Sequence, residues 1–451
     1  MATSRFWLTT LGCPKNQVDS DKLAGSLASE GYLPASSPES ADLVVVNTCA
    51  FIGPARQESI DTVLALDDVR KAGARLVVTG CMAERYGDEL AAALPEVDLV
   101  AGFGVALAPA PAVAVTLGPR PARGSVADFD LLELPRPASD TPWAYVKVAE
   151  GCDRRCGFCA IPSFRGRQRS RSVESVLAEV DALVAGDAEH PGAKEIVLVA
   201  QDLASYGRDR SAGRGSRPPG PLPLVELVRQ VAERVERTRL LYLYPSGLTD
   251  DLVGAMVATG VPYFDLSLQH VSRPLLARMR RWGDGERFVR RIDQIRSLRP
   301  DATFRSSFIL GYPGETEEDH DRLLAFLERA QLDWAGFFPF SPEEGTHAVD
   351  LEDQVAPELA AQRLAECSEL QDAITAQRRD LMVGTVQQVL IDAPGTGRTV
   401  HEAPEIDGVV RVPRQLAVGD LVDVEITASL GTDLEGRPSV DQPLAVAGRR
   451  E

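Results

Sequence analysis

The first hundred residues alternate short apolar runs with segments in which apolar residues recur at helical spacing. Helical patterns begin near Asp19, near Pro54 and again after Cys81, and the apolar runs before them are RFWLTTLG, DLVVVNTC and RLVVTGC. Apolar strands separated by helices are typical of a parallel sheet covered by helices. The pattern therefore predicts a parallel α/β domain, and the Pro- and Ala-rich segment from Leu107 to Pro142 predicts a partly structured linker.

Six further strand-like runs lie between residues 144 and 342, and each except the last is followed by a helical pattern. They are AYVKVAEG, EIVLVAQD, RLLYLYPS, YFDLSLQH, TFRSSFILG and WAGFFPFSP. Six such units predict a partial or open parallel barrel. The Gly-, Pro- and Ser-rich residues 208–223 predict a surface loop within it. A long helix predicted over residues 357–379 is expected to pack on the barrel.

The last part of the chain contains short strands, GTVQQVLID, GVVRVP and DLVDVEITASL, separated by Gly, Pro and Asp turns. Without a helical pattern, these strands predict a small β-barrel. The predicted fold class is α/β, with an N-terminal parallel α/β domain over residues 1–134, a central partial (βα)6 barrel over 135–380 and a terminal all-β barrel over 381–448.

Composition and charge narrow the choice of compartment and partner. No apolar run approaches the ~20 residues of a membrane span, and the first residues lack a secretory signal, so we expect a cytoplasmic protein that does not cross a membrane. The net charge of the 451 residues is −18, and residues 381–451 contain 11 acidic and 6 basic residues. Such a surface repels RNA and favours a basic partner.

Three cysteines, Cys152, Cys156 and Cys159, follow the first predicted barrel strand in a C-x-x-x-C-x-x-C spacing. We call them the barrel triad. Three thiolates hold three irons of a four-iron, four-sulfur cluster and leave one iron open to a cofactor. A zinc knuckle would need a fourth ligand, for which only Asp153 stands nearby, and ordinary buried cysteines are the other alternative. The spacing favours the open cluster.

A second set, Cys13, Cys49 and Cys81, which we call the N-terminal triad, ends three predicted strands of the first domain. Neighbouring strand ends lie ~5 Å apart, so the three thiols are expected to converge in a second metal site. Three independent structural cysteines are the alternative. Cys367 lies on the apolar face of the long helix and is interpreted as a core residue.

The barrel triad, with Phe158 before its last cysteine, resembles the radical S-adenosylmethionine (SAM) superfamily. Both triads and the terminal barrel resemble the methylthiotransferase family, through the motifs LGCPKNQVDS, VVNTCAFI, VTGC, QDLASYG, LQH and GYPGETEED. The resemblance implies two four-iron, four-sulfur clusters, SAM, a reductant protein and a TRAM-like terminal barrel. It also implies that SAM at the barrel triad yields a deoxyadenosyl radical, that the N-terminal triad's cluster delivers sulfur, and that a second SAM supplies the methyl group.

Polar residues at the ends of barrel strands are candidates for the SAM pocket. By position and resemblance the candidates are Phe158, Gln201, Asp202, Gln269 and Gly311. Packing of the barrel mouth, for Phe158, and helix capping or loop hydrogen bonds, for the polar residues, are the alternatives.

Two further stretches carry charge near the predicted site. Glu315 in GYPGE stands one residue later than the superfamily motif, and we assign it no ligand role. FRGRQRSRS carries Arg165, Arg167, Arg169 and Arg171, which predict either a site for a carboxylate or phosphate of the substrate or a solvated turn before a helix starting at Ser172.

The substrate is inferred from a branch of the family. LGCPKN, YPS at 244–246 and HEAPEIDG at 401–408 resemble the branch that modifies an aspartate of the small-subunit ribosomal protein numbered twelve, and the acidic terminal barrel suits that basic protein. The resemblance implies hydrogen removal from the aspartate β-carbon and sulfur insertion there, with no side chain as acid or base. A tRNA adenosine methylthiotransferase is the alternative within the family, and we do not expect tRNA as the partner. An iron–sulfur electron carrier is the alternative of another class, but a carrier normally adds a fourth cysteine ligand.

Overall fold

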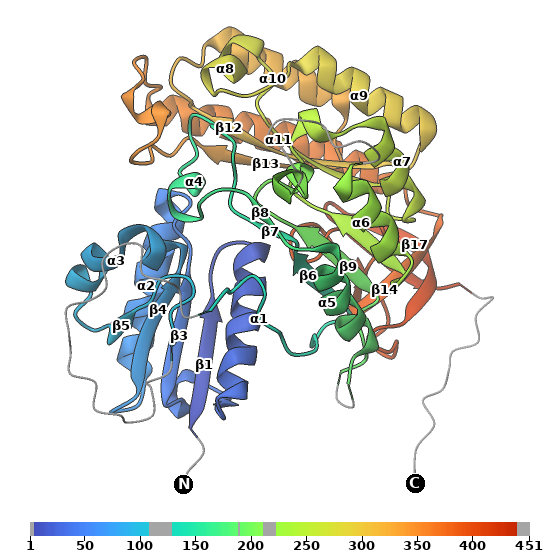
Figure 1. Ribbon diagram of the computed structural model, residues 1–451. Coiled ribbons are helices and arrows are strands. Elements are labelled where there is room, and N and C mark those ends of the chain that lie inside the picture. Colours follow the sequence, from blue (N-terminus) through green and yellow to red (C-terminus); the bar gives the residue numbers. More distant parts are fainter. Residues whose placement is uncertain (1–3, 108–128, 188–189, 211–221, 440–451) are drawn as a thin grey trace.

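The computed structural model describes residues 4–107, 129–187, 190–210 and 222–439. Most of the predicted linker and surface loop, residues 108–128 and 211–221, lies outside these ranges. Figure 1 shows an N-terminal α/β unit beside a larger half-barrel, with the terminal strands packed against the half-barrel. No helix in the described part of the chain is long and apolar enough to cross a membrane.

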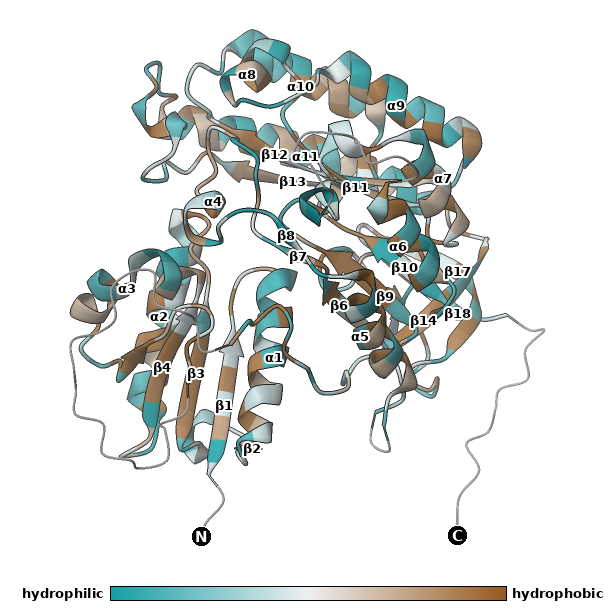
Figure 2. Cartoon of the chain, viewed as in Figure 1, coloured by the Kyte–Doolittle hydropathy of each residue, from teal (hydrophilic) through white to brown (hydrophobic). Residues whose placement is uncertain are grey.

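The N-terminal domain is a five-stranded parallel sheet in the order β2-β1-β3-β4-β5. Every residue of the central strand β3 is buried, and the strands are hydrophobic where the helices cover them (Figure 2). The strands are β1 (Arg5–Thr10), β2 (Leu33–Pro34), β3 (Leu43–Thr48), β4 (Arg75–Gly80) and β5 (Leu99–Val100). The helices are α1 (Pro14–Ser29), η1 (Pro38–Ser40), α2 (Gly53–Val69) and α3 (Cys81–Ala93). The parallel α/β prediction is confirmed, although α1 begins earlier than Asp19 because Pro14 fits the first helical position.

The barrel is open and contains the six predicted strands, each running parallel to its neighbours. They form two three-stranded sheets, β6-β9-β10 and β11-β12-β13, joined by one parallel bridge between Leu243 and Leu266. The third strand ends before YPS because Tyr242 has a φ of 66°, which extended chain does not adopt. The strands are β6 (Trp143–Lys147), β9 (Glu195–Val199), β10 (Arg237–Leu240), β11 (Tyr263–Gln269), β12 (Thr303–Leu310) and β13 (Trp334–Pro339).

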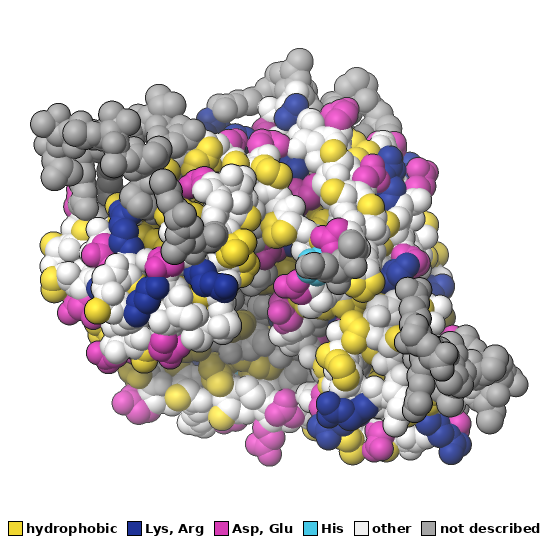
Figure 3. All heavy atoms as spheres, turned by 90° about the horizontal axis from the view of Figure 1, so that it is seen from below, with side chains coloured by type: hydrophobic (Ala, Val, Ile, Leu, Met, Phe, Trp, Pro, Cys, Tyr) yellow, Lys and Arg dark blue, Asp and Glu magenta, His cyan; other side chains and the backbone are white. Residues whose placement is uncertain are grey.

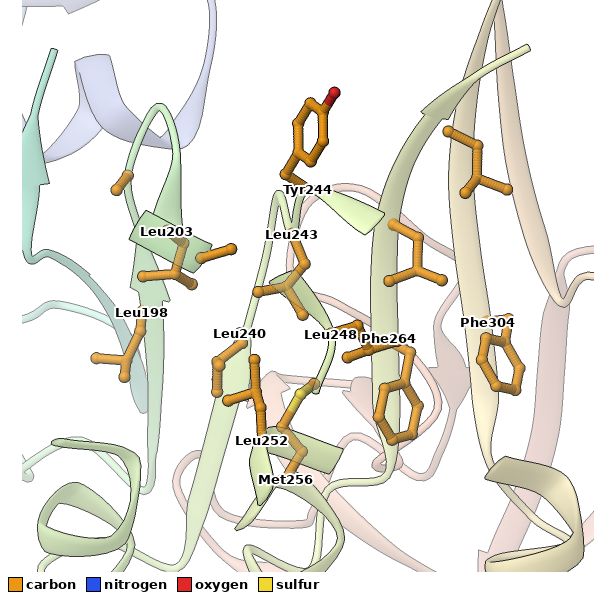
Figure 4. Packing of buried hydrophobic residues seen from close by; sticks show 14 of the residues in the cluster. Leu198, Leu203, Leu240, Leu243, Tyr244, Leu248, Leu252, Met256, Phe264 and Phe304 are labelled. Carbon is orange, nitrogen blue, oxygen red and sulfur yellow. The ribbon is translucent and has the colours of Figure 1, made fainter. Parts of the chain in front are cut away.

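Helices cover the outside of the open barrel and close its main hydrophobic core. Figure 4 shows Leu240 beside Leu252 and Met256, where β10 meets the helix that follows it. The predicted long helix is confirmed as α11, and Cys367 on it is fully buried, as predicted for a core residue. The helices are α5 (Val173–Ala185), η2 (Leu203–Ser205), η3 (Arg208–Arg210), α6 (Pro223–Ala232), η4 (Pro245–Gly247), α7 (Asp250–Ala258), α8 (Arg273–Arg278), α9 (Gly285–Leu298), α10 (Glu317–Ala330), η5 (His347–Asp350) and α11 (Pro357–Asp380).

The terminal domain is a closed five-stranded barrel in the order β14-β15-β16-β18-β17, with no helix within residues 381–439. Its interior holds Val389, Ile391, Val424 and Ile426, which alternate along two long strands. The strands are β14 (Val386–Ala393), β15 (Thr396–Arg398), β16 (Val410–Arg411), β17 (Leu421–Leu430) and β18 (Asp433–Pro438). The small all-β barrel is confirmed, including short strands that the apolar pattern did not reveal.

Candidate functional site

The barrel triad lies in the loop between two short elements, β7 (Ala149–Glu150) and α4 (Ile161–Phe164), at the carboxyl end of β6. The side chain of Arg281 donates a hydrogen bond to the Cys156 Sγ at 3.2 Å, and the backbone N–H of Arg154 donates to the Cys152 Sγ at 3.4 Å. Burial raises the pKa of Cys152 to about 11 and that of Cys159 to about 12. The loop is thus lined by sulfur ligands that a metal would have to hold as thiolates.

The N-terminal triad converges at the carboxyl edge of the first sheet. Cys13 caps α1, Cys49 follows β3 and Cys81 begins α3. Gly12 has a φ of +100°, and a Cβ added there would lie 3.0 Å from the Cys49 Sγ, so glycine leaves room for that thiol. Asn16 links the segments that carry the three cysteines. Its Nδ2 donates to the carbonyls of Leu11 and Thr48, and its Oδ1 lies 3.5 Å from the Cys81 Sγ.

The three thiols of this second triad differ in their electrostatic surroundings. Burial raises the pKa of Cys49 to about 12 and also raises that of Cys81. Burial opposes ionisation of Cys13 as well, but the charges of Lys15 and Arg165 outweigh it and lower the Cys13 pKa. Soft sulfur donors near fixed cations fit an iron–sulfur cluster, which is anionic when its thiolates are counted.

The described residues contain no preformed site for a single metal ion. Within residues 4–107, 129–187, 190–210 and 222–439, no three His, Cys, Asp or Glu side chains are grouped to hold a metal ion. Zinc draws its sulfur ligands to about 2.3 Å from one centre. In a four-iron cluster each thiolate binds a different iron, so the ligands stand farther apart. A four-iron cluster therefore needs a wider spacing of its sulfur ligands than a zinc site does.

The two triads lie on either side of a buried contact between the N-terminal domain and the barrel. Ala160 and Phe164, which follow the barrel triad, pack into the hydrophobic core of the N-terminal domain with Met82. Figure 1 shows α4 between the two units. The loop that carries one triad therefore ends inside the domain that carries the other.

Charged side chains line this contact. Lys147 at the end of β6 donates to Asp19 on α1 and, at 2.6 Å, to Glu150. Arg165 donates to the same two carboxylates. Burial favours the neutral form of Glu150, but the two cations outweigh it and hold its pKa below the usual range. These ion pairs hold the N-terminal domain and the barrel in one relative position.

The predicted SAM-pocket residues lie in the barrel-triad loop or at strand ends. Phe158 is half-buried against the barrel core. The Gln201 Nε2 donates to Glu150 at 2.7 Å, while its Oε1 is buried with no hydrogen-bond partner in the described part of the chain. Gln269 has a φ of 72°, and Gly311, with a φ of 73°, leaves no room for a side chain because of Ala360.

Asp202 and Glu315 each bind a neighbouring arginine. Asp202 accepts from the Arg154 Nε at 2.6 Å. Glu315 accepts from the backbone N–H of Gly311 at 2.6 Å and pairs with Arg363. Glu315 therefore stabilises its own loop.

The arginine-rich stretch is only partly a solvated turn. Arg167 and Arg169 are exposed and pair with surface aspartates, and Ser172 caps α5 as predicted. Arg165 and Arg171 are instead buried in ion pairs, so the interpretation as a solvated turn is wrong for both. Local composition did not reveal that carboxylates from other elements would surround them.

Sequence reasoning also missed a cationic and aromatic cluster beside the barrel triad. The centre of the Tyr244 ring lies 3.7 Å from the guanidinium carbon of Arg154 and 4.4 Å from that of Arg281. Tyr244 belongs to the YPS motif, which was the available signal. Its partners come from distant segments that no local pattern connects.

The segment HEAPEIDG, residues 401–408, runs from the terminal domain to the N-terminal triad. The Tyr145 hydroxyl donates to the Pro404 carbonyl at 2.9 Å, and the Trp334 Nε1 donates to the His401 carbonyl at 2.9 Å. A cavity of about 170 Å³ is lined by Cys13, Gln17, Tyr145, Glu405 and Ile406, among others. The terminal domain thus contributes an acidic side chain to a cavity beside Cys13.

Three family models match successive parts of the chain. Residues 5–102 match the uncharacterized protein family UPF0004, residues 146–327 match the radical SAM superfamily and residues 383–438 match the TRAM domain. The radical-SAM match implies SAM and an iron–sulfur cluster as cofactors.

Curated relatives match nearly the whole chain and share one name, ribosomal protein uS12 methylthiotransferase RimO. The relative from Saccharopolyspora erythraea is 41% identical, covering 97% of this chain and 96% of its own. The relative from Moorella thermoacetica is 43% identical, covering 94% and 96%, and that from Streptomyces coelicolor is 38% identical, covering 97% of each. This protein, with its two cysteine triads and its terminal barrel, belongs to the RimO family of radical-SAM methylthiotransferases.

Proposed function

We propose that the protein adds a methylthio group to the β-carbon of an aspartate in the small-subunit ribosomal protein numbered twelve, the uS12 of its relatives' names. The proposal includes two four-iron, four-sulfur clusters, at Cys152, Cys156 and Cys159 and at Cys13, Cys49 and Cys81. When bound, the first cluster and SAM supply a deoxyadenosyl radical, and the second cluster supplies sulfur.

The observation that carries the proposal is the placement of two cysteine triads at carboxyl strand ends of adjoining domains. Carboxyl strand ends are where parallel sheets and barrels assemble their active sites. Arg165 contacts the N-terminal triad from the barrel side, and Phe164 packs into the N-terminal core. One substrate carbon placed between the domains would therefore face both triads.

Phe158, Gln201, Gln269 and Gly311 are proposed to contact SAM at the barrel mouth. The buried Gln201 Oε1 supports this role, because it is an acceptor without a partner in the described residues and would suit a bound ammonium group. Gly311 lies just after the carboxyl end of β12, where a φ of +73° and the neighbouring Ala360 side chain leave room only for glycine. The chain's residues in this proposal bind and orient groups and transfer no proton.

An acidic surface supports a basic protein substrate, either free or in the ribosomal subunit. The net charge is −18, and on the face seen in Figure 3 the described Lys and Arg side chains are interspersed with Asp and Glu. A net negative charge repels the phosphates of tRNA, so tRNA is not proposed as a partner. A reductant protein and a cytoplasmic location complete the proposal, as does the division into residues 1–134, 135–380 and 381–448.

Anaerobic reconstitution tests the enzyme. The chain should bind about eight irons and form deoxyadenosine from SAM when a reductant is added. An electron carrier would bind iron and form no deoxyadenosine.

Mass spectrometry of ribosomal protein twelve and of tRNA from a strain lacking the gene tests the substrate. The ribosomal peptide should lose the mass of one methylthio group, with hydrogen in its place. An unchanged peptide with altered tRNA would establish the tRNA alternative.

A further inference from the structure

Arg165 is the residue through which the barrel segment touches the N-terminal triad. Its side chain is 3% exposed. One guanidinium nitrogen donates to the Cys81 Sγ at 3.0 Å and to the Asn16 Oδ1 at 2.7 Å. The other donates to Asp19 at 3.1 Å and to Glu150 at 2.9 Å. The Arg165 side chain, which belongs to the barrel domain, therefore binds a cysteine thiol, a side-chain amide and a carboxylate of the N-terminal domain.

The surroundings of Arg165 hold its guanidinium in one place. The guanidinium carbon lies 4.5 Å from the centre of the Phe103 ring, and both terminal nitrogens donate hydrogen bonds to fixed acceptors. Lys147 also binds the Asp19 and Glu150 carboxylates and neutralises part of their charge. Arg165 therefore keeps its hydrogen bond to Cys81 while it pairs with them. Arginine keeps its charge when buried, and its planar fork loses little freedom in such a site.

A cation at this position has a defined effect on a bound cluster. The potentials of iron–sulfur clusters depend on net charge, on hydrogen bonds to the sulfurs and on exposure to solvent. Reduction adds negative charge, which a neighbouring guanidinium stabilises strongly in a buried site. An N–H donated to a ligand sulfur acts in the same direction.

We propose that Arg165 is a positioning residue that holds the N-terminal triad against the barrel and, through its hydrogen bond to the Cys81 Sγ, raises the reduction potential of the cluster bound there. This inference rests on the proposed function, because it requires a cluster at Cys13, Cys49 and Cys81. It assigns to Arg165, the second residue of FRGRQRSRS, a role toward the cofactor and not toward substrate phosphate.

The test uses the full chain with the barrel triad changed to alanine, so that only the N-terminal triad holds iron. In this background Arg165 is kept or replaced by Arg165→Met or Arg165→Lys, and each protein is reconstituted anaerobically. Iron and sulfide analysis and a redox titration followed by electron paramagnetic resonance give readouts independent of turnover. With Arg165 present, about four irons should bind.

Arg165→Met should make the midpoint potential more negative and change the resonance spectrum. Arg165→Lys should recover part of the potential shift, because it restores the charge without the planar fork. Should the methionine variant fail to fold, as circular dichroism would reveal, the lysine variant alone still carries the comparison. Arg169→Met is the matched control, since Arg169 lies in the same segment but is exposed and pairs with Asp130.

The two proposals fail in different ways. If the background chain with Arg165 binds no iron, a second cluster is excluded, and the proposed function fails together with the role of Arg165. If about four irons bind and the potential and spectrum are the same with Arg, Lys or Met at 165, the inference on Arg165 is overturned while the second cluster stands.

Discussion

Glu195 is a buried carboxylate between the barrel and the terminal domain, and we expect Glu195→Gln to loosen that contact. The side chain is 0% exposed at the start of β9. Its Oε1 accepts from the Arg239 Nε at 2.6 Å, and its Oε2 accepts from Arg398 of the terminal domain at 2.9 Å. Arg237 and Arg239 in turn donate to carbonyls of the terminal domain. The Glu195 carboxylate therefore neutralises positive charge from several buried guanidinium groups.

Two routes give the size of the effect. Burial alone would raise the pKa of Glu195, but Arg239, Arg398 and Arg237 outweigh burial and lower it from 4.5 to about 2. At about 1.4 kcal/mol per pKa unit, this shift corresponds to about 3 kcal/mol. Removing one partner of a buried ion pair costs about 3–5 kcal/mol, which agrees. The contact should therefore open about a hundredfold more often in the variant.

The sign of the pH dependence follows from the lowered pKa. Because the folded-state pKa lies below the unfolded value, the contribution of Glu195 is complete above about pH 6 and is lost as the pH falls toward 2. Glu195→Gln should remove this component, so wild type and variant should converge in stability as the solution is acidified.

Hydrogen exchange of amides in β15 and β17 measures opening of the terminal domain without assuming that a multidomain chain unfolds in one step. Glu425→Gln is the control, because Glu425 forms a surface pair with Arg437 worth at most about 1 kcal/mol. Equal exchange rates in Glu195→Gln and Glu425→Gln, or the same pH dependence in Glu195→Gln and wild type, would refute the reasoning.

Three further substitutions separate the site from the core. Gly311→Ala should lower the midpoint of unfolding and weaken SAM binding in equilibrium dialysis, since the new Cβ would lie 2.6 Å from the Ala360 Cβ at a φ of +73°. An unchanged midpoint together with unchanged SAM binding would contradict this. Glu405→Gln should raise the KM for a basic ribosomal peptide severalfold in a steady-state assay, because the Glu405 carboxylate lines the cavity beside Cys13. The control is Glu435→Gln on the exposed surface of the terminal barrel, which should leave the KM unchanged. Equal KM values for the two variants would count against an acidic subsite. Cys367→Ala should cost about 1 kcal/mol in denaturant unfolding and leave the iron content unchanged, as expected for a buried residue that is no ligand, so a loss of iron would overturn the core assignment.

The strands and the cysteines at their ends were predictable because burial imposes a local pattern. A strand covered on both faces must be continuously apolar, as in β3, and the first polar or thiol position marks its end. The same reasoning placed Cys49 and Cys81 at one sheet edge. Short strands such as β2 and β15 escaped it, because two or three residues carry no periodicity.

The buried charges were not predictable in the same way. Arg165 and Arg171 stand in a stretch that composition assigns to solvent, and their burial depends on Asp19, Glu150 and Glu179 from other elements. Arginine is rarely buried without such partners. Only the folded arrangement of α1, β7 and α5 brings the charges together, so a single sequence gives no local sign of them.

The position of these cations suits the binding of the two proposed anionic clusters by an acidic chain. Lys15 and Arg165 act on Cys13, Arg154 acts on Cys152, and Arg281 donates to Cys156. Charges within a few ångströms in a buried site dominate, whereas exposed charges are screened beyond about 10 Å in ordinary salt. The field at the thiols is therefore set by the few charged side chains next to them, so the net charge of the outer surface can be negative without affecting the thiols. Neutralising exposed acidic residues should then weaken the binding of a basic substrate and leave the cluster potentials unchanged.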